Sequence, residues 1–275
     1  MLVETLRVVE AIGGSLLQAL PISIALGFCF AVLSRWFACN PGPAWWHKRE
    51  IVTDLCYWFF IPLVTRYVRI GLLVIGAGLV FQIHGADALI KFYDNGHGPI
   101  SKLPLWVQAL TFMVASDFLL YWNHRAFHDT KLWKYHAVHH SSEELDWISA
   151  ARFHPVNLFL GAVAVDVLLL LVGISPNIMV VVGPFTVAHS AFVHANLGWT
   201  LGPLKYIFAT PVFHRWHHTA LDRGGSHNFA GTFAFWDILF GTYYMPEHQL
   251  PDAYGIDDAE FPRGFSRQLL YPFQQ

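Results

Sequence analysis

The amino-acid sequence predicts an all-α membrane protein, a polytopic helical bundle with a histidine-rich helical cap. The chain of 275 residues is 55% hydrophobic and only 13% charged, whereas soluble domains carry about a quarter charged residues. Its apolar residues gather in segments long enough to cross a bilayer, which takes roughly 20 helical residues. Its 16 histidines are concentrated in a few short clusters.

About four to five membrane segments are predicted, over residues 8–33, 51–81, 103–123, 156–174 and 177–197. The second segment is the least regular, because Pro62 interrupts it and Arg66 and Arg69 lie inside it. Arginine deep in a bilayer is costly unless it reaches the interface or faces protein. This segment therefore predicts an interfacial stretch near residues 51–63, followed by a short, tilted crossing.

The connections between the segments predict the topology. Only Ile174–Asn177 separates the last two segments, which predicts a helical hairpin that enters and leaves on the same side. The region 85–101 is rich in Gly, Asp, Asn and Pro and predicts a plain loop. We expect one membrane-embedded domain over residues 1–275, made of N-terminal membrane segments (1–102), a histidine-rich, candidate catalytic region (103–248) and a C-terminal tail (249–275).

Basic residues predict the orientation in the membrane. They cluster in the loops after the first and third segments, as Arg35, Lys48, Arg49, Arg125, Lys131, Lys134 and Arg152. Because short basic loops stay in the cytoplasm, the cap with its histidine clusters is expected to face the cytoplasm. The N-terminus lacks a basic region before a short apolar core, so no removable signal peptide is expected. The net charge of −2 gives no indication of nucleic-acid binding.

Three histidine clusters are spaced as neighbours on a helix. They are HRAFH (His124, His128), HAVHH (His136, His139, His140) and HRWHH (His214, His217, His218). Residues three and four apart share a helix face, and neutral imidazole is a good ligand for iron, zinc, copper and nickel. Eight imidazoles are more than one ion can use, so the clusters predict two metal ions. A solvated or hydrogen-bonded patch is the better explanation for a lone pair, but not for three clusters together.

Two further histidines lie near the end of the fifth segment, His189 and His194 in HSAFVHANLG. Five residues apart, they are offset by about 140° on a regular helix. Both can face one site only if the helix ends or bulges there. We include both as predicted metal ligands, with a buried, hydrogen-bonded histidine as the alternative for His189. Four other histidines stand alone in predicted loops: His47, His84, His97 and His248.

Asp117 and Tyr121 continue the His124 face of the third segment into the membrane. Asp117 is expected to accept the distal N–H of a ligand histidine, or else to pair with Arg66 or Arg69. Asp166, halfway along the fourth segment, is either a pocket group or a helix–helix contact. The catalytic residues predicted beside the ligands are Asp117, Tyr121, His154, Asn196, His227 and Asn228, of which His154 and His227 are expected to support the ligands or the fold.

From about Asp117 to Tyr244 the sequence resembles the integral-membrane fatty acid hydroxylase/sterol desaturase superfamily. The shared phrases are DFLLYWNHRAFH, HAVHHSS, ARFHP, HANLG, TPVFHRWHHT and FWDILFGTYY. The resemblance implies a non-haem di-iron centre, with zinc possible in isolated protein, that uses O2 to attack a lipid C–H bond. It implies as ligands His124, His128, His136, His139, His140, His194, His214, His217 and His218, and leaves the role of His189 open.

The resemblance also concerns the source of electrons. Members with a fused haem donor domain carry an additional HPGG-type segment, which this sequence lacks. A separate reductase, ferredoxin or cytochrome is therefore the implied partner, besides the membrane and the lipid substrate. Neither the lipid nor the choice between hydroxylation and desaturation follows from the sequence. Residues 235–240 (FWDILF) are expected to form an interfacial helix that closes the cap.

Two other classes of protein are considered. A membrane zinc hydrolase needs a general base beside the metal, as in HExxH, but Glu143 and Glu144 have no histidine at that spacing. A metal transporter or store places ionisable ligands inside its crossing helices, whereas most of these histidines lie outside the predicted spans. The sequence therefore favours a membrane oxidoreductase that acts on a lipid.

Overall fold

The computed structural model describes residues 2–274, with side chains described from residue 20 onward except at residues 179 and 180; residues 1 and 275 of the predicted domain lie outside this range. Within the described part the fold is all-helical, without a strand. Four helical stretches are long and apolar enough to cross a membrane: Leu20–Phe37, Ile51–Phe81, Leu105–Asp129 and Pro155–Val172. The prediction of an all-α, polytopic membrane bundle is confirmed.

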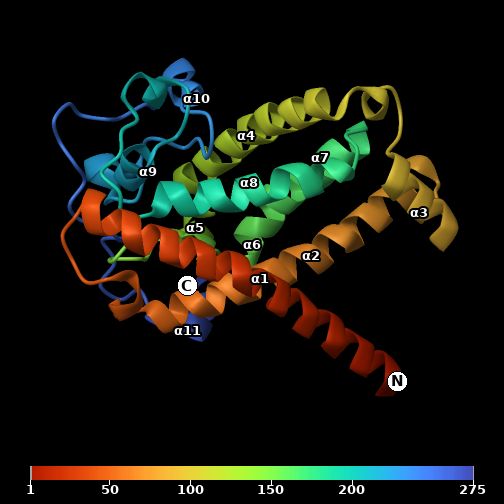
Figure 1. Cartoon of the computed structure of the whole chain (residues 1–275), viewed down its shortest axis with the longest axis horizontal. Coiled ribbons are helices and arrows are strands. Elements are labelled where there is room, and N and C mark those ends of the chain that lie inside the picture. The colour runs from red at the N-terminus through yellow and green to blue at the C-terminus, as the bar shows by residue number, and fades with distance from the viewer. Residues whose placement is uncertain (1, 275) are drawn as a thin grey trace.

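The long helices extend from a cap of short helices at one end of the molecule toward α3 at the other end (Figure 1). The long elements are α1 (Leu2–Phe37), α2 (Ile51–Phe81), α4 (Leu105–Asp129), α7 (Ala164–Val172) and α8 (Asn177–His194). The cap contains α5 (Trp133–His140), α9 (Pro211–His217) and α10 (Phe235–Leu239). Helix α4 packs against both α7 and α8, and α2 packs against α7.

Shorter helical turns connect these elements. They are η1 (Trp45–His47), α3 (Ala86–Asn95), η2 (Ile100–Lys102), η3 (Trp147–Ala151), α6 (Pro155–Leu158), η5 (Gly202–Tyr206), α11 (Phe265–Leu270) and η7 (Tyr271–Phe273). Two further turns, η4 (Phe159–Val163) and η6 (Leu221–Gly225), have π-type hydrogen bonding and are kinked at Gly161 and Gly224, whose backbone angles are not helical. Such turns are common at functional sites.

The predicted hairpin is present between α7 and α8. Gly173 ends α7 with φ of +117°, a left-handed conformation that favours glycine at a helix C-terminus. A Cβ there would also lie 2.7 Å from the carbonyl oxygen of His97. After the turn, Ile174 and Ile178 pack with Phe112 of α4, so α8 returns to the cap along α4.

The predicted interruption of α2 is absent, whereas the interfacial position of residues 51–63 stays a prediction. Residues Ile51–Phe81 form one helix that includes Pro62. Arg69 pairs with Asp166 of α7, so a residue on a neighbouring helix compensates its charge. The same ion pair settles the role of Asp166 as a helix–helix contact.

The prediction that residues 85–101 form a plain loop is also wrong, because α3 and η2 lie within it. Phe92 of α3 is buried, with its ring 5.6 Å from that of Phe81. His97 packs 4.2 Å from Phe81 and 5.1 Å from Phe92. One buried aromatic residue thus anchors a segment that otherwise has the composition of a loop.

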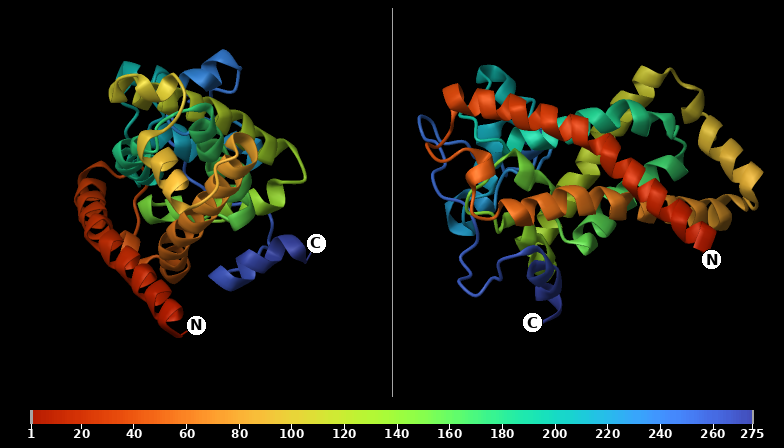
Figure 2. Two further views of the ribbon diagram at one scale, coloured as in Figure 1. Left: turned by 90° about the vertical axis from the view of Figure 1, so that its right-hand side faces the viewer. Right: turned by 60° about the horizontal axis from the view of Figure 1, so that its bottom comes forward.

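Residues 249–275, predicted as a tail, fold against the bundle beside α2 (Figure 2). Phe265 of α11 packs edge-on against Tyr57 and Phe60 of α2, with ring centroids 4.8 and 5.2 Å apart. His154 also holds this segment, because its Nε2–H donates a hydrogen bond to the carbonyl oxygen of Leu269 at 3.1 Å. The C-terminal segment therefore closes one side of the cap.

A buried charge network ties the start of α2 to the η3 segment. Arg152 is fully buried and pairs with Asp54 at 2.6 Å and Glu50 at 3.0 Å. Lys48 pairs with Asp146 at 2.9 Å. Breaking a buried pair by removing one partner typically costs several kcal/mol, about 3–5. The network therefore fixes the backbone at Arg152, which lies beside the histidine clusters.

Candidate metal centre

Nine of the ten histidines predicted as ligands form two groups in the cap. Within each group, one nitrogen of every ring lies within 4.8 Å of the others. The five-histidine group contains His124, His128, His136, His140 and His217, and the four-histidine group contains His139, His194, His214 and His218. These rings come from the ends of α4 and α8, from α5 and from α9 with the residue that follows it.

Each HxxHH cluster divides between the two groups in the same way. In α5, His136 and His140 join the five-histidine group while His139 joins the other. In α9 the division is reversed, because His214 and His218 join the four-histidine group and His217 the five-histidine group. Side chains at i+3 and i+4 diverge by about 100° around a helix. One short helix can therefore supply ligands to two adjacent ions.

The spacing of the nitrogens fits metal coordination. In the four-histidine group the Nε2 atoms of His194, His214 and His218 lie 3.1–3.2 Å from one another, and His139 Nε2 lies 3.3 Å from His194 Nε2. In the other group, the Nε2 atoms of His124 and His136 are 2.8 Å apart. Two nitrogens about 2.0–2.1 Å from one ion, at tetrahedral or octahedral angles, lie roughly 2.9–3.4 Å apart.

Hydrogen bonds at the other ring nitrogen orient several of these imidazoles. The Nδ1 atoms of His124, His194 and His217 lie 2.7 Å from the carbonyl oxygens of Phe229, Ser190 and His227. His139 Nδ1 lies 3.2 Å from the carbonyl oxygen of Arg152, and His136 Nδ1 lies 2.7 Å from Asn157 Oδ1. An oxygen of this kind accepts the Nδ1 proton, so the Nε2 lone pair points into the group.

Several nitrogens in the groups have no hydrogen-bond partner. They include Nε2 of His128, His140 and His217, which are buried. An unsatisfied buried polar atom costs about 1–3 kcal/mol. Burial lowers the pKa of His217 and of His140 well below the usual value, because desolvation penalises the charged ring. Converging, neutral lone pairs without protons between them fit a bound cation.

Asp117 does not accept a proton from a ligand histidine, contrary to the prediction. Its two carboxylate oxygens accept the backbone N–H groups of Thr232 and Phe233, each at 2.8 Å. Tyr121 is buried, and its hydroxyl lies 2.8 Å from that of Thr242. Both side chains therefore hold the segment after α9 against α4 and lie outside the two histidine groups.

The other predicted catalytic residues also support the fold around the groups. Asn196 accepts from the backbone N–H of Asn40 and donates to its carbonyl oxygen. Asn228 has φ of +59° and bonds through its amide to Phe213 and Tyr244. His227 contributes its carbonyl oxygen, not its ring, to His217.

His154 caps α6 by accepting the N–H of Val156 at its Nδ1. Its ring lies among Tyr135 and Phe273, outside both histidine groups. His189 is the predicted ligand that joins neither group. Its Nε2 lies 3.2 Å from the carbonyl oxygen of Gly231, and its ring stacks on Phe185 of the same helix.

Three residues that sequence reasoning missed position the histidines of the two groups. Asn157 orients His136, and buried Arg215 donates to the carbonyl oxygens of Leu145, His194 and Ala195. Asp237 accepts the N–H groups of Phe229 and Ala230 and the hydroxyl proton of Thr242, which fixes the loop that bonds to His124. The available signals were a charged residue inside HRWHH, one inside FWDILF, and an amide three residues after His154.

A cavity of about 320 Å³ lies between α4, the α6–η4 segment and α8, and it reaches both histidine groups. At its inner end it is lined by His124, His136, His139, His194 and His214. Away from the groups its walls are mainly apolar and include Met113, Leu120 and Phe185. Phe185 and Thr186 are exposed on the bundle surface, so the cavity opens beside α8.

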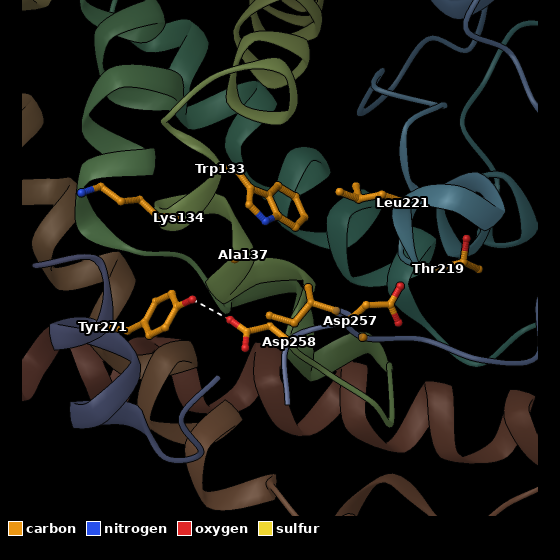
Figure 3. Close-up of a pocket in the computed structure, with 10 residues that line it drawn as sticks. Trp133, Lys134, Ala137, Thr219, Leu221, Asp257, Asp258 and Tyr271 are labelled. Atoms are coloured by element: carbon orange, nitrogen blue, oxygen red, sulfur yellow. Dashed lines mark hydrogen bonds between the residues drawn. The ribbon is translucent and has the colours of Figure 1, made fainter. Parts of the chain in front are cut away.

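A smaller cavity of about 190 Å³ lies on the cap and shares no lining residue with the larger one (Figure 3). Trp133, Asp257 and Tyr271 are among its walls, and Tyr271 donates its hydroxyl proton to Asp258 at 2.7 Å. The Trp133 ring lies 5.0 Å from His128 and 5.3 Å from His140. The Trp133 indole thus contacts the five-histidine group and also lines this cavity.

The fold and the site together define a class: polytopic membrane proteins with a paired histidine site beside an apolar cavity. The family model described as Fatty acid hydroxylase matches residues 109–242. Ornithine lipid hydroxylase OlsE of Rhizobium tropici is 32% identical over 89% of this chain and 73% of its own length. The chain belongs to the fatty acid hydroxylase family, as its motifs predicted.

Other relatives match a smaller part of their own length. Alkylglycerol monooxygenase of Caenorhabditis elegans is 32% identical over 78% of this chain but only 43% of its own length. Very-long-chain aldehyde decarbonylase GL1-11 of Oryza sativa subsp. japonica is 33% identical over 51% of this chain and 55% of its own length. No solved structure matches the chain. The named hydroxylase and monooxygenase relatives confirm the prediction of a membrane oxidoreductase.

Proposed function

We propose that this protein catalyses the O2-dependent oxidation of a lipid C–H bond, by hydroxylation or desaturation, at two histidine-held iron ions. The five-histidine group would hold one ion and the four-histidine group the other. The observation that carries the proposal is the position of the two groups, because both line one apolar cavity that extends between membrane helices. When bound, the ions would supply the redox chemistry that activates O2.

Aromatic side chains cover the histidine rings and exclude water. Phe153 stacks on His139 with centroids 4.0 Å apart and planes within 11°. Phe229 lies 5.1 Å from His128 and 5.8 Å from His217. A site that handles a strong oxidant benefits from such a dry wall, since water diverts reactive species.

The shape and opening of the cavity support entry of the substrate from the bilayer. Its wall on α8 extends from His194 to Phe185, which is about 14 Å at 1.5 Å per residue. The outer end opens at a helix surface that carries exposed apolar residues such as Phe185 and Val187. A lipid could therefore enter sideways from the membrane with its reacting carbon innermost.

We further propose that the cap faces the cytoplasm and receives electrons there from a separate donor protein, a reductase, ferredoxin or cytochrome. The basic residues of the loops next to the cap support this orientation. Trp133 supports the direction of electron delivery, because its ring contacts both a surface cavity and the five-histidine group. The electron donor and the lipid would then reach the histidine groups from different cavities.

The test is a reconstitution in lipid nanodiscs with iron, a ferredoxin and its reductase, and isotopically labelled O2. Ornithine lipid and 1-O-hexadecylglycerol are supplied because the named relatives act on such lipids. We expect labelled hydroxyl in a product, or a new double bond, and neither with His139→Ala. His84→Ala, at an exposed residue outside both groups, is the matched control. Absence of any oxidised lipid, from protein whose iron the donor reduces, would contradict the proposal.

A further inference from the structure

The larger cavity contains no lysine or arginine among the described residues that line it. Burying a carboxylate or phosphate in an apolar site is costly unless a cation pairs with it. Asp117 adds a carboxylate to the wall instead. An anionic lipid group would find positive charge only at the metal ions, where it would compete for them rather than hold the chain beside them.

His189 is the polar ring that faces this cavity without joining a histidine group. It lies five residues before His194, which is about 7.5 Å farther out along α8. Its Nε2 is 3.2 Å from the carbonyl oxygen of Gly231. Since a carbonyl oxygen only accepts, Nε2 carries the proton and Nδ1 keeps its lone pair. No hydrogen bond from another described residue engages that Nδ1.

Two contacts fix this ring in place. Phe185 stacks on it with centroids 5.5 Å apart and planes within 13°, and Phe192 packs 6.1 Å away. If the ring rotated by 180°, it would lose its hydrogen bond to the carbonyl oxygen of Gly231. His189 therefore presents a hydrogen-bond acceptor at a set distance from the two groups.

We propose that His189 forms a subsite that accepts a hydrogen bond from the polar group of the lipid substrate. The inference rests on the proposed function and narrows its substrate class to lipids with a donating group, such as a hydroxyl, an amide N–H or an ammonium. Lipids that present a carboxylate at this point are disfavoured. The oxidised carbon lies farther in, between the polar group and the histidine groups.

The experiment compares three probes with a straight chain of sixteen carbons: 1-hexadecanol, hexadecyl methyl ether and palmitate. Their affinity is measured by native mass spectrometry on the purified protein loaded with zinc, so that no lipid is oxidised. The wild type is compared with His189→Leu, which removes the acceptor, and His189→Gln, whose amide oxygen restores one. His84→Ala is the control, and zinc content reports whether each variant keeps its metal groups.

We expect the wild type to bind hexadecanol about 3- to 10-fold more tightly than the methyl ether, as one net hydrogen bond allows. Palmitate should bind no better than the ether. His189→Leu should lose the preference for hexadecanol while keeping its zinc, and His189→Gln should keep part of that preference. An undiminished preference in His189→Leu, tightest binding of palmitate, or no binding of any probe would overturn the subsite.

Failure of the subsite and failure of the proposed function give different results. A preference for hexadecanol that depends on His189, in a protein that oxidises no lipid, would leave the subsite standing and refute the oxidation. Lipid oxidation by a protein without that preference would support the proposed function and refute the subsite.

Discussion

Several imidazoles of the two groups are oriented by oxygen acceptors whose positions do not follow from the spacing of the histidines in the sequence. His124, His194 and His217 bond through Nδ1 to backbone carbonyl oxygens, and His136 to the side chain of Asn157. Such partners fix both the tautomer and the direction of the ring, and their loss typically costs 10- to 100-fold in metal affinity. The supporting contacts therefore matter nearly as much as the ligands.

Asn157 allows a direct test of this support. Replacing it with leucine removes the acceptor of the His136 Nδ1 proton, so we expect the five-histidine group to bind metal about 10- to 100-fold more weakly. The four-histidine group should be unaffected, because the histidine that Asn157 orients, His136, belongs to the other group. Metal titration followed by elemental analysis measures both affinities. Asn157→Asp, which keeps an acceptor oxygen, is the control, and equal affinities in wild type and Asn157→Leu would contradict the expectation.

The sequence predicted the grouping of the histidines better than it predicted the residues that support them. The i, i+3, i+4 spacing identifies imidazoles that share a helix face, and nine of ten came together as predicted. The acceptors could not be found this way, since every residue has a carbonyl oxygen. His189 joined neither group because five residues separate it from His194 on a helix that stays regular to its end.

The π-helical turn η4 brings α6 and α7 together with a local change of register. Gly161 within it has φ of −97° and ψ of −107°, outside the helical region. A Cβ at this position would lie 2.9 Å from Asn123 Oδ1, the residue before His124. Asn123 donates in turn to the carbonyl oxygen of Leu160. The turn and α4 thus form one tightly packed wall of the larger cavity.

Gly161→Val tests whether this wall limits the lipid. The added side chain must push Asn123 or occupy the cavity, so we expect lipid oxidation to fall at least about tenfold, in line with the effect of small displacements near reacting atoms. Metal content should stay unchanged, because neither Gly161 nor Asn123 belongs to a histidine group. Gly71→Val in α2 is the matched control, since a Cβ there meets no atom within 4 Å. Wild-type turnover by Gly161→Val would show that the wall does not define the site.

The errors at this level also have physical causes. Pro62 and two arginines predicted a broken α2, but a cross-helix partner, Asp166, could not be assigned from one segment alone. The composition of residues 85–101 predicted a loop, although Phe92 buries enough surface to hold a short helix. In both places contacts between distant segments override the local pattern.

In the molecule as a whole, two separate cavities lie beside the two histidine groups. Its long helices carry the larger cavity, which opens beside α8, and its cap carries the smaller cavity beside Trp133. Helix α3 lies at the end opposite to the cap (Figure 1). The all-α architecture and the membrane segments followed from composition and segment length, but the two cavities depend on packing that no segment determines alone.

Orientation can be checked with single cysteines in a background without Cys29, Cys39 and Cys56. We expect Asp87→Cys, in α3, to react on intact bacterial cells with a maleimide that cannot cross the membrane. Asp257→Cys, on the cap, should react only after permeabilisation, because the positive-inside rule predicts a cytoplasmic position for the basic loops next to the cap. Both positions are exposed. The opposite labelling pattern would place the histidine groups outside the cell.

The central claim is that the two histidine groups each hold one metal ion. Metal content per chain, measured on gently solubilised protein from iron-replete cells, tests it most directly. We expect about two ions in the wild type, with iron dominant, and about one in either His217→Ala or His214→Ala, which affect different groups. A wild type without tightly held metal, or variants that keep both ions, would contradict it.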